Sequence, residues 1–286
     1  MASVADDIDR QFDLLLQVPD DARADLYKAM RHSAIGGGKR LRPLLVMATA
    51  RLFNVDQSYA LRAATAVEAL HVYSLIHDDL PCMDDDDLRR GKPTVHKKYG
   101  EAIGVLAGDA LLTLAFEIMA NPKLHKSAAL RLGAIAGLAK AAGTHGMIGG
   151  QVIDIMADEA SRNEALITQL QSLKTGALIR YAVEAGSILG GANVDQTENL
   201  LAYADDLGLI FQITDDLLDV EGDADIMGKA ANKDDGRGKA TFVSILGLDG
   251  AKAKAAQLGD EAKTALTPYG ADADVLCATV DFVLNR

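Results

Sequence analysis

Residues 69–96 read ALHVYSLIHDDLPCMDDDDLRRGKPTVH, in which an apolar stretch runs directly into a dense group of aspartates. The apolar part, VYSLIH, has helical character and ends at Asp78 and Asp79. Carboxylates packed this closely at the end of a buried helix repel one another unless a cation shares them. The stretch therefore predicts a buried helix that ends at a cation-binding acidic cluster.

A second acidic cluster lies far along the chain and has the same local design. DDLLD, residues 215–219, follows the apolar stretch LGLIFQIT, and its first and last aspartates are four residues apart on one helix face. Hard carboxylate oxygens favour Mg²⁺ or Ca²⁺ over zinc. A calcium-binding EF-hand is excluded for the first cluster, because Met83 and Arg89 stand where its loop needs glycine and glutamate. The candidate metal ligands are Asp78, Asp79, Asp84, Asp215 and Asp219.

The spacing in the first cluster raises a geometric problem. Asp78 and Asp84 are six residues apart, which on a regular helix separates them by about 120°. Pro81 makes a regular helix unfavourable there. If two residues loop out, the pair regains the geometry of residues four apart, and both clusters could aim paired carboxylates into one cavity. We interpret residues 85–87, also aspartates, as solvated surface charge.

The rest of the chain predicts an all-α fold. Alanine and leucine dominate, and alternating β-branched patterns are scarce. An amphipathic helix is expected at the N-terminus, two or three helices are expected after Thr241, and long helices are expected at residues 42–54, 58–79, 101–119, 124–142, 163–189 and 196–220. Several are apolar on much of their surface, which suits the interior of a large bundle. No shift in composition divides the chain, so a single domain over residues 1–286 is expected.

One segment departs from this pattern. Residues 221–239, EGDADIMGKAANKDDGRGK, are rich in glycine and charge and lack helical periodicity. The segment is typical of a mobile surface loop. A plain connector and a loop that closes over substrate are both consistent with it.

Composition limits the classes of function. The chain has 286 residues and a formal net charge of -12, which disfavours nucleic-acid and anionic-membrane partners. No apolar run approaches the roughly 18 residues that a bilayer span needs. Cys82 and Cys277 form neither a zinc spacing nor a disulfide framework. We expect a reduced cytoplasmic protein, which could handle anionic substrates only through metal ions or local basic groups.

Basic residues do accompany both clusters. Arg89 and Arg90 follow the first, and Lys229 and Lys239 follow the second. Residues 36–43, GGGKRLRP, combine a glycine-rich backbone with three cations just before a predicted helix, which favours an anion. This is not a Walker loop, because an arginine stands where serine or threonine is required.

His71 lies seven residues before Asp78 and shares its helix face within about 20°. A lone histidine on a helix is usually structural, but this one points toward the predicted cation site. Geometry alone therefore leaves a structural role and a site role equally open.

Taken together, these motifs resemble those of the trans-prenyltransferases, the all-α family of short-chain isoprenyl diphosphate synthases. Within that family, the sequence is most similar to the bacterial-type farnesyl diphosphate synthases. The matching stretches span essentially the whole chain: GGGKRLRP, residues 69–96 as quoted, LAGDALL, GGQVIDI, LKTGALI, FQITDDLLD and GKATF. The resemblance implies an isoprenoid synthase bundle of about ten core helices around a central apolar cavity. It also implies a homodimer that joins isopentenyl diphosphate to an allylic diphosphate with Mg²⁺, for which Mn²⁺ can substitute.

The resemblance also implies roles for individual residues. Asp78 and Asp84 would bind two Mg²⁺ on the allylic diphosphate, and Asp215 a third. Substrate contacts are implied for residues of the basic segments: Arg89, Lys174 and Lys229 on the allylic diphosphate, and Lys39, Arg42, His71 and Arg90 on isopentenyl diphosphate. Thr175 and Gln212 match residues that face the reacting carbon and stabilise a carbocation.

Product length is expected to depend on the helix before the first cluster. Tyr73 and Ser74 lie five and four residues before Asp78, so Tyr73 is about 7.5 Å down the helix. An aromatic residue here resembles the farnesyl diphosphate synthases and implies a C15 product. The segment LPCMDDDDLRRGKPT also resembles plastid-type geranylgeranyl diphosphate synthases, so a C20 product is the alternative.

Two other functions compete with chain elongation. A terpene cyclase would share one aspartate motif, but the second motif and GGGKRLRP argue against it. A catalytically silent partner subunit would be expected to lack aspartates, and none is missing here.

Overall fold

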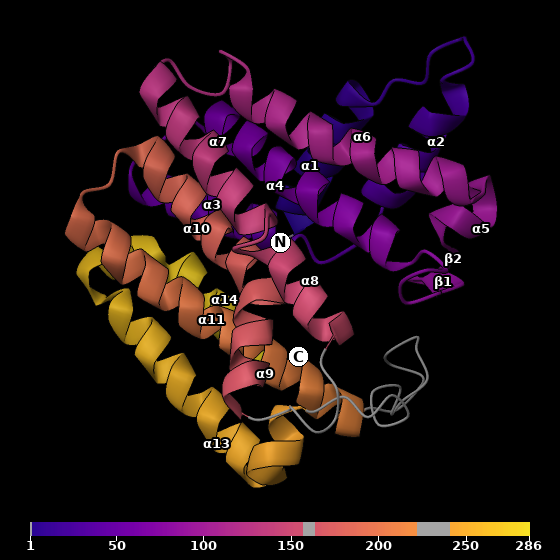
Figure 1. The fold of residues 1–286 in the computed structure, drawn as a ribbon. Helices are drawn as coiled ribbons and strands as arrows, with labels where there is room; N and C mark the ends of the chain where they lie inside the picture. Colours follow the sequence, from indigo (N-terminus) through magenta and orange to yellow (C-terminus); the bar gives the residue numbers. More distant parts are fainter. Residues whose placement is uncertain (1, 157–163, 222–240) are drawn as a thin grey trace. The chain divides into compact units, whose positions relative to one another are not determined.

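A computed structural model of the chain describes residues 2–156, 164–221 and 241–286 (Figure 1). These residues are almost entirely helical, which confirms the predicted all-α fold. The strands in the described part are β1 (Leu88–Arg89) and β2 (Lys92–Pro93), which pair in a small antiparallel hairpin. The chain divides into two compact units. Unit 1 is Met1–Met47 with Val55–Ile135, and unit 2 is Ala48–Asn54 with Ala136–Arg286. The expected single domain over 1–286 stays a prediction.

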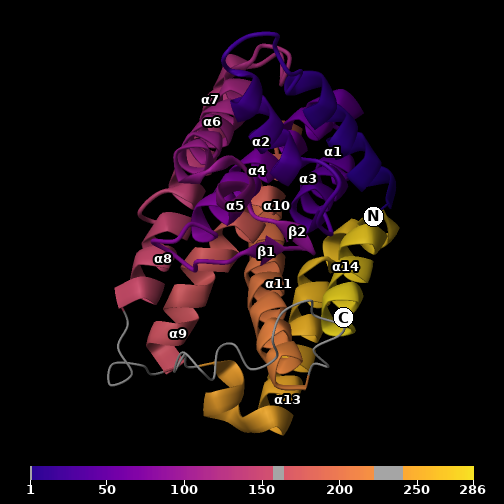
Figure 2. The same ribbon diagram turned by 90° about the vertical axis from the view of Figure 1, so that its right-hand side faces the viewer.

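Unit 1 is built around one buried helix. The helices that contribute to it are α1 (Ala2–Leu15), α2 (Ala24–Ala34), the start of α3 (Leu41–Leu52), α4 (Gln57–Asp78), α5 (Val95–Tyr99), α6 (Glu101–Ala120) and the start of α7 (Ala128–Ala142). α4 packs on α1, α2 and α6. Its small and branched side chains, such as Ala63, Val67 and Leu70, are inaccessible to solvent. The hairpin β1–β2 follows the end of α4 and leads into α5 (Figure 2). The acidic end of α4 and the basic hairpin thus belong to one unit.

Helix α6 corrects one expectation from the sequence. Glu101–Ala120 is long and apolar enough to cross a membrane by length and composition alone, with a mean hydropathy of 1.8. Leu111, Ala115 and Met119 are nevertheless buried inside unit 1, where α6 packs along α4. A core helix of a soluble protein passes the same test, so this one helix does not indicate a membrane protein.

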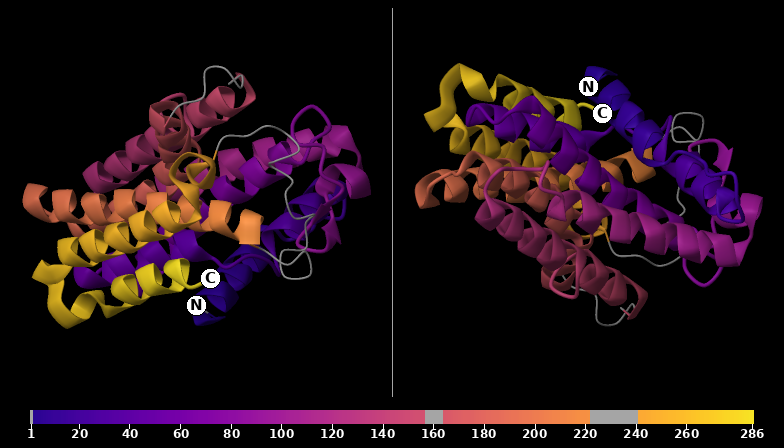
Figure 3. Two further views of the ribbon diagram at one scale, coloured as in Figure 1. Left: turned by 90° about the horizontal axis from the view of Figure 1, so that it is seen from below. Right: turned by 90° about the horizontal axis from the view of Figure 1, so that it is seen from above.

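Unit 2 contains the second acidic cluster. Its elements are α8 (Met147–Met156), α9 (Glu164–Gln171), a π-helical segment (Ser172–Gly176), α10 (Ala177–Gly190), α11 (Val194–Glu221), α13 (Phe242–Ala265), a 3₁₀ segment (Thr267–Ala273) and α14 (Asp274–Leu284). α11 and α13 run side by side, with α14 against both (Figure 3). α13 is kinked at Gly247, whose φ of 70° a glycine adopts readily. α11 therefore lies in the interior of unit 2 and carries DDLLD near its C-terminal end.

Candidate active site

The first cluster is shaped by the way α4 ends. The helix stops at Asp78, and the chain then turns back so that the backbone N–H of Asp84 donates to the carbonyl of Asp78 at 2.8 Å. A helix would make this bond to the fourth residue along, so two extra residues have looped out. Pro81 and the left-handed Asp85, with φ of 52°, lie in this loop and its exit. The backbone thus loops out in the way that the spacing of Asp78 and Asp84 allowed, while the pairing of their carboxylates around a metal stays a prediction.

Asp79, the second residue of the cluster, is turned inward. Its carboxylate is 3% exposed and accepts hydrogen bonds from Arg89 Nε at 2.8 and 2.9 Å and from the Arg89 NH2 group at 2.6 Å. Burial acts to lower the pKa of Arg89, but the hydrogen bonds and charge of Asp79 outweigh it and raise that pKa. Asp79 therefore fixes the guanidinium of Arg89, a predicted diphosphate ligand, beside the first cluster.

Arg90 packs against the glycine-rich loop. A Cβ added at Gly37 or Gly38 would lie 2.9 or 2.7 Å from the end of the Arg90 side chain, which would have to shift, and Gly38 also has φ of 86°, a conformation that favours glycine. A small cavity of about 40 Å³ opens here, and among its lining residues are Gly36, Gly37, Asp79, Arg89 and Arg90. The loop and the two arginines after the first cluster thus meet at one cavity within unit 1.

His71 lies within this cationic region. Its pKa is well below the ordinary value of 6.5, first because the ring is desolvated and then because of the charges of Arg42, Arg90, Arg89 and Arg40. The imidazole is therefore neutral at neutral pH. Unit 1 brings His71, Arg42 and Arg90 near one another, and their role in binding isopentenyl diphosphate stays a prediction. Lys39 is exposed one residue before Arg40, and Arg42 lies in the first turn of α3.

The residues predicted to set product length are on the same helix. Tyr73 is 5% exposed, and its ring is edge-on to His77 with centroids 5.7 Å apart. Among the described residues its buried hydroxyl has no hydrogen-bond partner. Burial, followed by the charge of Asp78, raises the pKa of Tyr73 to about 12. The Ser74 hydroxyl donates to the His71 carbonyl at 2.9 Å, so its hydrogen bond is made within α4.

In unit 2, the aspartates of the second cluster have different surroundings. Asp216 is buried and accepts from Gln212 Nε2 at 3.0 Å and from the backbone N–H of Phe242 at 2.7 Å. It therefore joins α11 to the first residue of α13. Asp215 is partly exposed and is paired with Arg286, whose guanidinium also lies 3.9 Å from the Phe211 ring centroid. Sequence reasoning missed Asp216 and Arg286, since nothing in the motif distinguishes adjacent aspartates.

Lys174 and Thr175 lie in the π-helical segment, a form often found at functional sites. Two glycines of neighbouring helices lie against the backbone of this segment. A Cβ at Gly150 of α8 would be 2.2 Å from the Lys174 backbone nitrogen, and a Cβ at Gly208 of α11 would be 3.2 Å from Gly176 Cα. The Lys174 ammonium pairs with Asp154 of α8 at 2.6 Å. Asp154 was not predicted, although it lies in the stretch GGQVIDI that carried part of the resemblance.

A further acidic group lies just beyond the first cluster. Ligand atoms of Asp85, Asp87 and His96 are within 4.8 Å of one another, the one such group of three found in the described residues. Lys97 pairs with Asp87 at 2.7 Å. The surface role that we assigned to residues 85–87 stays a prediction. The predicted ligands Lys229 and Lys239, and the segment 221–239 except its first residue, lie outside the described residues.

The chemistry of these groups fits one class of substrate. Unit 1 combines carboxylates at the end of α4 with Arg89, held by the buried Asp79, and with Arg90 nearby, which suits a diphosphate bound together with a hard divalent ion. Unit 2 provides a second pair of carboxylates and an ordered lysine. The donor set therefore fits Mg²⁺ in both units.

Comparisons with known proteins agree with this chemistry. The family described as polyprenyl synthetase matches residues 23–267. The chain is 44% identical to the farnesyl diphosphate synthase of Geobacillus stearothermophilus over 92% of this chain and 89% of that protein. It is 45% identical to the chloroplastic geranylgeranyl pyrophosphate synthase of Capsicum annuum, over 91% and 71% of the two chains.

A solved structure extends the likeness to the fold. The apo crystal structure of an FPP/GFPP synthase from Zymomonas mobilis matches with a TM-score of 0.91 and 52% identity, over 99% of this chain and 97% of that one. The all-α isoprenoid synthase fold is thereby confirmed. The chain belongs to the polyprenyl synthetase family and is a short-chain prenyl diphosphate synthase, a prenyltransferase of isoprene biosynthesis.

Proposed function

We propose that the enzyme condenses isopentenyl diphosphate head to tail with dimethylallyl and geranyl diphosphate, in the presence of Mg²⁺, to give (E,E)-farnesyl diphosphate and diphosphate. The observation that carries the proposal is the loop that returns Asp84 to Asp78 beside Arg89 and Arg90. It supplies hard oxygen ligands and fixed guanidinium groups, the two requirements for holding a diphosphate as it leaves.

Asp78 and Asp84 would hold two Mg²⁺ ions, and Asp215 a third. Bound Mg²⁺, or Mn²⁺ in its place, supplies positive charge that stabilises the departing diphosphate. Arg89, kept in place by Asp79, contributes a further cation on the same group, as would Lys174 and Lys229. Lys39, Arg42, His71 and Arg90 would hold isopentenyl diphosphate, whose double bond attacks the allylic carbon.

Gln212 has a defined orientation for its proposed role. A carboxylate only accepts hydrogen bonds, so the amide group of Gln212 that faces Asp216 must be its NH₂. Its carbonyl oxygen then points away from Asp216 and can stabilise positive charge on the allylic fragment. Thr175 would do the same from the π-helical segment. The proton lost from C2 passes to the departed diphosphate, so no Ser, Cys or His nucleophile is needed.

We infer a C15 product from Tyr73. Its aromatic ring is buried on α4, five residues before Asp78, where it can block a growing chain. Similarity does not decide the length, because relatives named for farnesyl and for geranylgeranyl products are 44% and 45% identical. A C20 product therefore remains the second candidate. We also propose a cytoplasmic homodimer.

The test is to incubate the pure protein with isopentenyl and dimethylallyl diphosphates and Mg²⁺, and to separate the dephosphorylated products by chromatography. Farnesol as the main product supports the proposal, and geranylgeraniol would assign the C20 function. Cyclic hydrocarbon would indicate a terpene cyclase. Absence of any product under saturating substrate would indicate a partner subunit.

A further inference from the structure

Arg40 lies in the middle of GGGKRLRP but differs from its basic neighbours. Lys39 is exposed and Arg42 half-buried, whereas the Arg40 side chain is only 1% exposed. Its backbone has φ of 49°, a left-handed conformation that a non-glycine residue rarely adopts. Such a conformation persists where the surroundings fix it.

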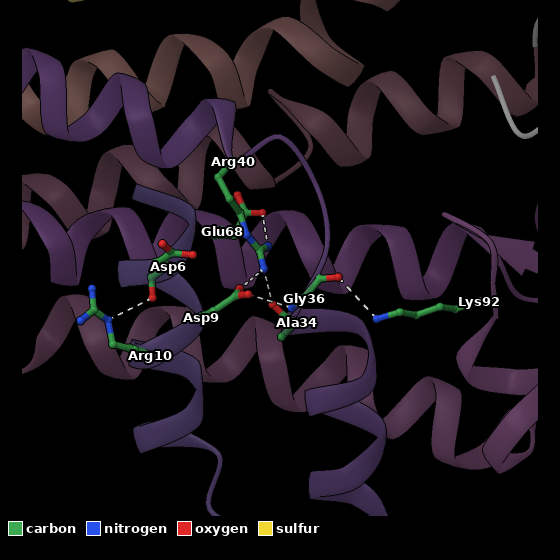
Figure 4. A network of polar contacts seen from close by, with 8 residues as sticks. All are labelled: Asp6, Asp9, Arg10, Ala34, Gly36, Arg40, Glu68 and Lys92. Atoms are coloured by element: carbon green, nitrogen blue, oxygen red, sulfur yellow. Dashed lines mark hydrogen bonds and ion pairs between the residues drawn. The ribbon is translucent and has the colours of Figure 1, made fainter. Parts of the chain in front are cut away.

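The guanidinium of Arg40 joins three helices of unit 1 (Figure 4). NH1 donates to Glu68 Oε1 of α4 at 2.7 Å. NH2 donates to Asp9 Oδ1 of α1 at 2.6 Å and to the Ala34 carbonyl, the last residue of α2, at 2.5 Å. Two of these partners, Asp9 and Glu68, are 31 and 28 residues away in the sequence, and Ala34 is six residues away.

The start of the same loop is held by the same carboxylate. Asp9 Oδ2 accepts from the backbone N–H of Gly36 at 2.9 Å, while its other oxygen accepts from Arg40 (Figure 4). Lys92 of the hairpin also donates to the Gly36 carbonyl, at 3.4 Å. Both ends of residues 36–40 are therefore tied to α1, and one end is tied to α4.

These contacts rule out a direct diphosphate role for Arg40. Its charge is balanced by two carboxylates, and one of them, Glu68, is itself only 2% exposed. Its planar guanidinium is directed into the unit rather than into solvent. Nor is Arg40 a bystander charge, because a buried charged group needs compensating partners, and here three defined groups accept its hydrogen bonds.

We infer that Arg40, through Glu68 and Asp9, is a positioning residue that fixes how residues 36–42 present Lys39 and Arg42 to isopentenyl diphosphate. Glu68 is three residues before His71 on α4, so the same contacts set the loop relative to His71. The inference rests on the proposed isopentenyl diphosphate pocket and deepens it. Arg40 acts on the substrate only through its neighbours.

The experiment compares the two substrates in steady-state kinetics. Variants R40K, E68Q and D9N weaken the contacts in different ways, and a lysine cannot reproduce the fork of an arginine. Each is expected to raise KM for isopentenyl diphosphate about 10- to 100-fold, the cost of a small misplacement. KM for geranyl diphosphate should stay within about twofold, since that substrate is bound by other residues.

Two reference variants make the result specific. R31Q removes a comparable tie between α2 and the end of α1, in which Arg31 donates to Asp13 at 2.5 Å and to the Leu16 carbonyl at 3.1 Å. It does not touch the loop and should leave both KM values unchanged. R42Q removes a proposed ligand directly and should raise KM for isopentenyl diphosphate alone.

The outcomes distinguish the positioning role of Arg40 from the isopentenyl diphosphate pocket itself. Equal increases in both KM values for R40K, E68Q and D9N would show a purely structural role and overturn the inference. Normal KM values in these three, with R42Q impaired, would overturn it while leaving the pocket intact. A normal R42Q would instead refute the pocket, and the positioning role with it. If E68Q fails to fold, the more exposed D9N still gives the test.

Discussion

The second aspartate of each cluster is the buried one. Asp79 binds Arg89, and Asp216 binds Gln212 and the start of α13, while Asp78, Asp84, Asp215 and Asp219 are partly exposed. A buried carboxylate that accepts several hydrogen bonds serves to orient its donors. We therefore expect the first and last aspartates to carry the metal-dependent chemistry. Asp79, also predicted as a metal ligand, has its carboxylate engaged by Arg89.

Replacing Asp78 or Asp215 with alanine should reduce turnover by at least about 10²–10³-fold, because each substitution removes a group that stabilises developing charge. Steady-state rates at saturating Mg²⁺ measure the effect. D85N is the matched control, since asparagine tolerates the left-handed backbone at that position and residue 85 has no assigned role. Near-normal turnover in D78A and D215A would reject the metal assignment.

The neutral state of His71 predicts an acid-dependent loss of stability. Its folded pKa is well below 6.5, so the unfolded chain binds a proton that the folded chain does not. This contribution is complete above pH 6.5 and is lost as the pH falls below that value, by up to about 1.4 kcal/mol per pH unit. Urea unfolding between pH 7 and 5 should show a smaller decrease for H71Q than for the unsubstituted protein. Parallel curves for the two proteins would contradict a buried neutral imidazole.

Tyr73 should limit product length by the bulk of its ring. Its hydroxyl makes no hydrogen bond within the described residues, so Y73F should leave the product unchanged. Y73A removes the ring and should shift the product from C15 toward C20 or longer. Chromatography of dephosphorylated products distinguishes the three proteins. An unchanged product from Y73A would remove Tyr73 from this role.

Among the elements, the π-helical segment differs from the regular helix that the sequence predicted. One long helix was expected over residues 163–189, but the structure divides it into α9, the π-helical segment and α10. The extra residue per turn is accommodated by close contact with Gly150 and Gly208, which belong to other helices. Short elements such as α2, α5 and α8 were also absent from the expected helices. Hydrophobic periodicity is a weak signal over so few residues, and whether such short segments form helices depends on their tertiary contacts.

Gly150 offers a test of this element. A methyl group there would collide with the Lys174 backbone nitrogen at 2.2 Å, so G150A must displace the segment that carries Lys174 and Thr175. We expect G150A to lower kcat about 100-fold or more and to lower the melting temperature. G176A, whose new Cβ would meet its nearest neighbour at 3.5 Å, is the control within the same segment. Equal losses of kcat and melting temperature in the two variants would contradict a specific role for the close approach at Gly150.

At the scale of the whole molecule, an acidic protein must bind anionic substrates. With a net charge of -12, long-range electrostatic repulsion opposes the binding of an anion, and local basic or metal-binding clusters must overcome it. In unit 1, Arg42, Arg89 and Arg90 lie around His71 and supply this local positive charge. The carboxylates of both units add sites at which a divalent ion can make the local charge positive.

Metal and diphosphate should therefore stabilise the protein together. Thermal unfolding with Mg²⁺ and inorganic diphosphate should give a higher melting temperature than the sum of the two separate shifts, because each ligand creates part of the other's site. Removing the divalent ion with EDTA should abolish the cooperative part of the shift, and adding back Mg²⁺ or Mn²⁺ should restore it, which is the control. Additive shifts would contradict a shared site.

The sequence by itself determined the helical fold, the positions of the acidic clusters near helix ends and the end of the helix before Pro81. These follow from local periodicity and from proline, which act within a few residues. Only the tertiary structure decided which aspartates turn inward and where Arg40 and Lys174 are held. Their partners are 28 and 20 residues away, and Asp216 meets a backbone group 26 residues away. Such pairs form only when helices pack, and no local pattern encodes them.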